Sequence, residues 1–359
     1  MCDKNNSGAG SGWLAFNAGN RVLVAQSFDG GKTFPVHVIL AEPNSEVDWG
    51  PDARPKIAID ASGRIVVAFA VFKDKHFNGQ VFHVVSSDGG KTFSEPEPIT
   101  DIQESQRFEE LAVDPSGRLF ATWLDKRNRV PARQRGERYM GAALAFAWAD
   151  GRRIGSTQIA ADNTCECCRI AVAFGHDGQP VVLFRNIFSG GIRDHAIVSF
   201  TAATTPGTIR RVSNDDWKTD ACPHHGPALA IGSAGTRHVA WYTNGSVRKG
   251  LFYANATDGE ASFSEPMPIG ASARNPSRPA LATVGKKVHL VWKEFDGKVT
   301  TIAHMLSADD GRSWTAAQVV AKTAADSDHP LLLTQGSSVY LSWMTQDEGY
   351  RLVLIGSGA

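Results

Sequence analysis

The sequence lacks any apolar run near the roughly 20 residues that a membrane-spanning helix needs. It has no excess charge either, because 37 lysines and arginines balance 37 aspartates and glutamates. Without a basic field or a basic amphipathic stretch, we expect no nucleic-acid partner and no membrane-surface helix. A phosphate-cradling glycine loop and a Gly-x-Ser-x-Gly motif are also missing. The most informative features of the sequence are its internal repeats.

No segment has helical periodicity, and a strand that ends in an aromatic residue recurs instead. Each copy continues the same order: an apolar strand, a glycine turn, the aromatic-ended strand and two further strands. A unit of four antiparallel strands that recurs about every 50 residues predicts an all-β, six-bladed β-propeller of four-stranded blades. The closing aromatics are Phe69, Trp123, Phe184, Trp241, Trp292 and Trp343, at intervals of 54, 61, 57, 51 and 51 residues.

The two ends of the chain decide how the ring closes. Residues 13–16, 21–25 and 36–40 supply outer strands without an inner one, and the last repeat ends at residues 351–355. Pairing N- and C-terminal strands in one blade would close the ring and remove exposed edges. The ends offer one strand too many, so seven blades is the alternative. Within the ring, the charged insertion at residues 125–138 is expected to be a solvated loop.

Residues 1–11 are polar and rich in glycine and serine, which predicts a disordered lead-in before a single propeller domain at residues 12–359. One interpretation is that Met1 replaces a removed export signal. Cys2 would then be the lipid-bearing first residue of a mature bacterial lipoprotein, and the protein would be periplasmic or extracellular. The alternative is a cytosolic start or a remnant of cloning.

A second repeat has the chemistry of a hairpin turn. Its clean copies span residues 27–34, 86–93 and 307–314, where Ser and Asp accept hydrogen bonds from turn amides and Gly takes positive φ. The motif resembles the Asp-box, S-x-D-x-G-x-[TS]-[WF], or BNR repeat, of the sialidase (neuraminidase) superfamily. The resemblance implies a propeller and a structural role for the turn. The residues expected to build it are Ser27, Asp29, Gly31, Ser86, Asp88, Gly90, Ser307, Asp309 and Gly311.

The same resemblance implies a glycosidase site, in which three arginines hold a substrate carboxylate and a tyrosine is the nucleophile. The inner-strand arginines Arg54, Arg169 and Arg278 are the candidates for the triad, and Tyr350 for the nucleophile. The family's Phe/Tyr-Arg-Ile-Pro motif is matched only by residues 53–56, which lack the aromatic and the isoleucine. An exo-acting, sialidase-type glycoside hydrolase is therefore an alternative function.

Two segments, Cys165–Cys168 and Cys222–His225, carry four of the five cysteines. Cys165 and Cys222 both lie 13 residues before the turn glycine of their repeat, so these loops are equivalent in neighbouring blades and should meet at one mouth of the channel. Thiolate and imidazole together suit a soft or borderline metal. The candidate ligands are Cys165, Cys167, Cys168, Cys222, His224, His225 and His329.

The cluster allows three interpretations, and a combination of one disulfide with a metal bound by the remaining cysteine and the histidines is also open. Disulfides could staple the blades, as clustered cysteines usually do in an oxidising compartment. One cysteine could be a reactive thiolate beside a cation. The pair of histidines after Cys222 favours metal binding, with copper preferred to zinc, for metal handling or redox chemistry. A propeller scaffold for a protein partner, with cysteines only as staples, is the remaining alternative.

Overall fold

The computed structural model describes residues 12–50, 52–151, 153–257 and 262–356, and it is built almost entirely of antiparallel β-strands. The lead-in predicted for residues 1–11, with Cys2, lies outside these residues. Within them, no helix is long and apolar enough to cross a membrane. The chain forms two compact units: unit 1 reaches Ile170 and also holds residues 200–207 and 222–224, and unit 2 holds the rest.

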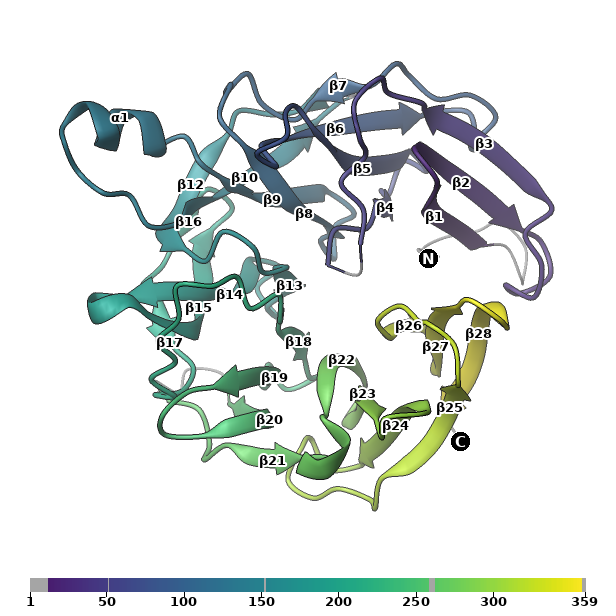
Figure 1. The fold of residues 1–359 in the computed structure, drawn as a ribbon. Helices are drawn as coiled ribbons and strands as arrows, with labels where there is room; N and C mark the ends of the chain where they lie inside the picture. The colour runs from purple at the N-terminus through teal and green to yellow at the C-terminus, as the bar shows by residue number, and fades with distance from the viewer. Residues whose placement is uncertain (1–11, 51, 152, 258–261, 357–359) are drawn as a thin grey trace. The chain divides into compact units, whose positions relative to one another are not determined.

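Unit 1 contains three antiparallel series of strands, coloured purple to teal in Figure 1. The strands pair in the orders β1–β2–β3, β4–β5–β6–β7 and β8–β9–β10–β12, with β11 on β10. The bounds are β1 (Gly12–Ala18), β2 (Arg21–Ser27), β3 (Val36–Ala41), β4 (Lys56–Ile59), β5 (Ile65–Phe72), β6 (Gly79–Ser86), β7 (Glu97–Pro98), β8 (Gln106–Val113), β9 (Leu119–Asp125), α1 (Arg129–Gln134), β10 (Ala142–Asp150), β11 (Arg153–Ile154), β12 (Gln158–Thr164) and β16 (Thr205–Pro206).

Unit 2 contains four antiparallel series, coloured teal to yellow (Figure 1). The orders are β13–β14–β15–β17, β18–β19–β20–β21, β22–β23–β24–β25 and β26–β27–β28. The bounds are β13 (Ala171–Phe174), β14 (Pro180–Phe188), η1 (Ser189–Gly191), β15 (Ile192–Ala202), β17 (Arg210–Arg211), β18 (Ala228–Ile231), β19 (Arg237–Asn244), β20 (Lys249–Ala256), β21 (Met267–Ile269), η2 (Ser272–Arg274), β22 (Ser277–Val284), β23 (Lys287–Phe295), β24 (Thr300–Ser307), β25 (Gln318–Thr323), β26 (Leu331–Gln335), β27 (Ser338–Thr345) and β28 (Gly349–Gly356).

The six aromatic-ended segments all lie in the second strand of a series, as the repeat predicts, except that the N-terminal series β1–β3 has none. Phe69, Trp123, Phe184, Trp241, Trp292 and Trp343 are each at most 2% exposed. Their strands, such as β5 and β9, are buried on both faces, which explains why they read as continuous apolar runs. These strands form the core that holds the loops in place.

The glycine turns between the first two strands also pack against one another. Gly117 has φ +86°, and a Cβ there would lie 2.0 Å from the Cβ of Ala61, in the equivalent turn one series earlier. The Ala61 N–H donates to the Gly117 carbonyl at 3.0 Å. Glycine is thus required at this close approach.

The charged insertion differs from its prediction, because residues 129–134 form the short helix α1 rather than a loop throughout. Ala132 is the buried residue of this helix, and most neighbouring side chains are exposed. The number of blades, the closure of the ring by the terminal strands and the single-domain boundary stay predictions.

Candidate metal centre

The first ligand segment follows directly from the end of β12. Thr164, the last residue of that strand, is buried, and its hydroxyl donates to the Ala142 carbonyl of β10 at 2.6 Å. Asn163 has φ +59°, which turns the chain as it leaves the sheet. The Cys165–Cys168 turn therefore starts from a fixed point in unit 1.

Three thiols of this turn gather in the interior of unit 1. The Sγ atom of Cys165 lies 3.7 Å from that of Cys167 and 3.6 Å from that of Cys168. Each of the three residues is at most 2% exposed. A disulfide bond is only about 2.05 Å long, so these contacts are between thiols and not within a staple.

The second ligand segment brings a more exposed pair of donors to the same sulfurs. Cys167, Cys222 and His224 have ligand atoms within 4.8 Å of one another, as do Cys165, Cys167 and Cys168. Cys222 and His224 are exposed. The His224 ring lies 6.4 Å from the ring of Phe108, and its backbone takes a left-handed φ of +49°. Cys167 is common to both groups.

The surroundings of Cys167 favour its protonated thiol. Hydrogen bonds with Cys165, Cys168 and Cys222, followed by burial, raise the pKa of Cys167. The nearby cations are themselves paired. Lys126 contacts Glu166 at 2.6 Å, and the Nε of buried Arg169 lies 4.0 Å from Asp52. Cys167 is therefore not a low-pKa nucleophile, which weakens the redox-catalysis interpretation for this residue.

Two predicted ligands lie in unit 2 and in neither group of candidate ligand atoms among the described residues. The His225 ring stacks on Tyr242 with centroids 4.1 Å apart, and its carbonyl accepts a hydrogen bond from Arg185 at 3.1 Å. His329 is 4% exposed, and its backbone N–H donates to its neighbour Asp328 at 2.6 Å. The structure thus gathers Cys165, Cys167, Cys168, Cys222 and His224 of the seven residues predicted.

The glycosidase candidates are divided between the units. Arg54 and Arg169 belong to unit 1, whereas Arg278 and Tyr350 belong to unit 2. Arg169 faces the carboxylate of Asp52, the kind of pairing that a structural arginine makes. The Tyr350 hydroxyl shares a 3.0 Å hydrogen bond with Ser342, and burial raises its pKa, which opposes a nucleophilic role. Convergence of the three arginines stays a prediction.

Glu109 is a candidate acid that the sequence reasoning did not single out. Phe108 has φ +57°, and the register of β8 against β9 shifts between Arg107 and Glu110. Glu109 on this irregular stretch is buried, and desolvation raises its pKa to about 7. The adjacent glutamates Glu109 and Glu110, directly before the apolar residues Leu111, Ala112 and Val113, were the signal available in the sequence.

The three Asp-box turns share one hydrogen-bond pattern. In the second copy the Ser86 hydroxyl donates to Asp88 and accepts from the Gly90 N–H, both at 2.8 Å. Asp88 accepts from the Thr92 hydroxyl at 2.6 Å. The same bonds recur around Asp29 and Asp309, where the threonine or serine hydroxyl is the main cause of a pKa near 2. These motifs build turns, and their carboxylates are engaged within them.

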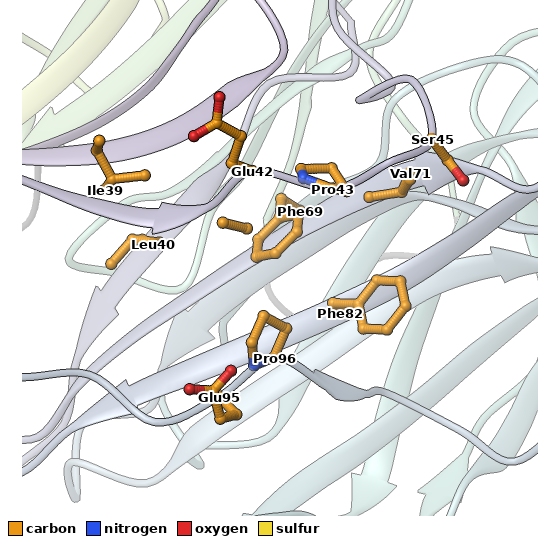
Figure 2. Close-up of a pocket in the computed structure, with 11 residues that line it drawn as sticks. Ile39, Leu40, Glu42, Pro43, Ser45, Phe69, Val71, Phe82, Glu95 and Pro96 are labelled. Carbon is orange, nitrogen blue, oxygen red and sulfur yellow. The ribbon is translucent and has the colours of Figure 1, made fainter.

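A hollow of about 500 Å³ lies elsewhere in unit 1, between β3 and the strands β5 and β6. Figure 2 shows its apolar lining, with Phe69, Phe82 and Pro96, and the carboxylates Glu42 and Glu95 beside it. None of the predicted metal ligands or arginines lines it.

No protein-family model and no curated protein matches the chain. Solved structures do match it. An ulvan lyase of polysaccharide lyase family PL25 is 11% identical with a TM-score of 0.60, covering 98% of this chain and 90% of its own. The fold is that of the β-propeller enzymes. A Hadza microbial sialidase, Hz136, is 13% identical with a TM-score of 0.58, and the match covers 94% of this chain and 74% of the sialidase. An α-L-arabinanase of Penicillium chrysogenum is 10% identical with a TM-score of 0.52, and the match covers 88% of this chain and 96% of the arabinanase.

Proposed function

We propose that this propeller binds a soft metal ion, copper(I) in preference to zinc, through its cysteine cluster. The observation that carries the proposal is the gathering of three buried Sγ atoms within 4.8 Å of one another, with that of Cys165 at 3.6–3.7 Å from the other two. A tetrahedral metal with bonds of about 2.3 Å to sulfur holds its sulfurs about 3.8 Å apart. The thiols need little movement to reach that spacing.

Copper(I) is the ion that the donor set favours. Soft thiolates select copper(I), zinc or iron–sulfur clusters. A structural zinc site takes four ligands, and the buried group offers three sulfurs, which suits the lower coordination numbers of copper(I). S–H groups are weak hydrogen-bond donors, so three of them packed together gain little from one another without a metal.

The bound metal would change the protonation of the site. Each ligating thiol must lose its proton, so metal binding releases protons and strengthens as the pH rises. The raised pKa of Cys167 makes this competition with protons stronger than for an exposed cysteine. The ion in turn supplies positive charge that offsets the buried thiolates.

The test is an anaerobic titration of reduced protein with copper(I) against a coloured copper(I) chelator. The wild type should withdraw copper from the chelator. Cys168→Ser should weaken binding by more than about 10-fold, the least that even an outer-shell partner is worth. His225→Gln, whose ring stacks on Tyr242 and which belongs to neither group of candidate ligand atoms, is the matched control and should bind as the wild type does. A wild type that takes no copper would contradict the proposal.

A glycoside hydrolase is the second candidate, supported by the similarity of the fold to a sialidase and an arabinanase. Unit 1 offers this chemistry a buried Glu109 with a pKa near 7 and Arg169 beside Asp52. Turnover of a fluorogenic sialoside, abolished in Arg169→Met and Arg278→Met, would support this candidate. A protein that binds copper and leaves the sialoside intact would exclude the sialidase activity.

A further inference from the structure

The two groups of candidate ligands differ in their access to solvent. Cys165, Cys167 and Cys168 are all buried, whereas Cys222 and His224 are exposed. Cys167 belongs to both groups, and Cys165, Cys168 and Cys222 all hydrogen-bond to its sulfur. The cluster thus has an inner set and an outer set that meet at one sulfur atom.

The five donors are more than one soft ion uses. Zinc in structural sites takes four ligands, and copper(I) takes no more. A single ion in the inner set would leave Cys222 and His224 without a role, although their ligand atoms lie within 4.8 Å of the Cys167 sulfur. A thiolate sulfur has several lone pairs and can bind two metal ions, so Cys167 can serve both sets.

Charge does not oppose a second ion. One monovalent ion with the three inner thiolates carries two net negative charges, and burying uncompensated charge is costly. A second monovalent ion, bound with the additional thiolate of Cys222, leaves the net charge at minus two. The nearby cations Lys126 and Arg169 are already shared with Glu166 and Asp52, so they cannot offset the whole cluster.

We propose that the cluster binds two copper(I) ions, an inner ion at Cys165, Cys167 and Cys168 and an outer ion at Cys167, Cys222 and His224. The thiolate of Cys167 bridges them. This inference rests on the proposed function. On loading, four S–H bonds break and four protons pass to solvent; Cys167 forms two copper–sulfur bonds and each other ligand forms one. Neither copper nor sulfur changes oxidation state.

The test is native mass spectrometry of reduced protein after anaerobic loading with copper(I) and removal of unbound metal. The wild type should carry two coppers. His224→Gln, an exposed substitution that leaves the interior intact, should keep only the inner ion. Cys167→Ser should lose the bridge and carry at most one. His225→Gln, whose ring stacks on Tyr242 in unit 2, is the matched control and should carry two.

The outcomes separate the two proposals. One copper in the wild type that is retained in His224→Gln and lost in Cys165→Ser would overturn the second ion and leave soft-metal binding intact. Two coppers retained in Cys167→Ser would overturn the bridge. A wild type that carries no copper would overturn both.

Discussion

Glu109 is a buried carboxyl group, outside the cysteine cluster, whose pKa lies near neutral pH. Burial raises its pKa from 4.5 to about 7, and Lys56 offsets only part of that shift. The unfolded chain releases this proton near pH 4.5, while the folded chain keeps it until about pH 7. Between these values the folded state binds the extra proton, so this group's contribution to stability falls as the pH rises.

Glu109→Gln should therefore remove a pH dependence of stability. The wild type should lose roughly 3 kcal/mol between pH 4.5 and pH 8 that the variant does not lose, since one pKa unit corresponds to about 1.4 kcal/mol. Urea unfolding at both pH values measures the difference. Glu110→Gln, which instead breaks a 2.9 Å ion pair with Lys56, should retain the wild-type dependence on pH. Parallel pH profiles for wild type and Glu109→Gln would show that Glu109 ionises normally.

The sequence repeat predicts the positions of the ligand residues only in part, and the difference arises at a single residue. Counting from the turn glycines places Cys167 opposite His224 and Cys168 opposite His225. His224 has φ +49°, whereas Cys167 does not have a positive φ. The backbones of the two ligand segments therefore diverge after this position, and the His225 ring stacks on Tyr242. A repeat in the sequence shows which residues occupy equivalent positions along the chain, but it does not reveal a local change of the backbone angle φ.

At the scale of elements, the Asp-box turns join neighbouring strand series. Gly90 has φ +82°, and a Cβ there would lie 2.1 Å from the ring of Trp13 in β1. The buried Ser86 hydroxyl accepts from the Gly90 N–H and so fixes the turn in this position. The motif is thus explained by backbone geometry and packing, which is why it predicts the fold and not an activity.

Ser86→Ala should destabilise unit 1 by about 1–3 kcal/mol, because it leaves the buried Gly90 N–H without its acceptor. Thermal or urea unfolding measures the loss. Lys91→Ala in the same turn should change stability by less than about 0.5 kcal/mol, since the turn uses only its backbone N–H. Equal stability of the two variants would show that the serine does not hold the turn.

Strand elements were the part of the fold best predicted from sequence. Aromatic-ended strands such as β5 and β9 are buried on both faces, so they appear in the sequence as largely apolar runs. The helix α1 was not foreseen, since its six residues are too few for a helical period and only Ala132 is buried. The irregular stretch of β8 that carries Glu109 depends on Phe108 at positive φ, a conformation unusual for an aromatic residue.

For the whole molecule, fold and chemistry have separate origins. Similarity to a lyase, a sialidase and an arabinanase at 10–13% identity shows a shared fold among proteins with different reactions. The cysteine cluster depends on residues outside the strands, Cys165 directly after β12 and Cys222 in the loop between β17 and β18. The function must therefore be judged from the site.

X-ray absorption at the copper edge of copper(I)-loaded protein tests the central claim most directly. Soft-metal binding by Cys165, Cys167 and Cys168 predicts a first shell dominated by sulfur, which diminishes in Cys168→Ser. A first shell of nitrogen and oxygen alone, unchanged by that substitution, would contradict the account.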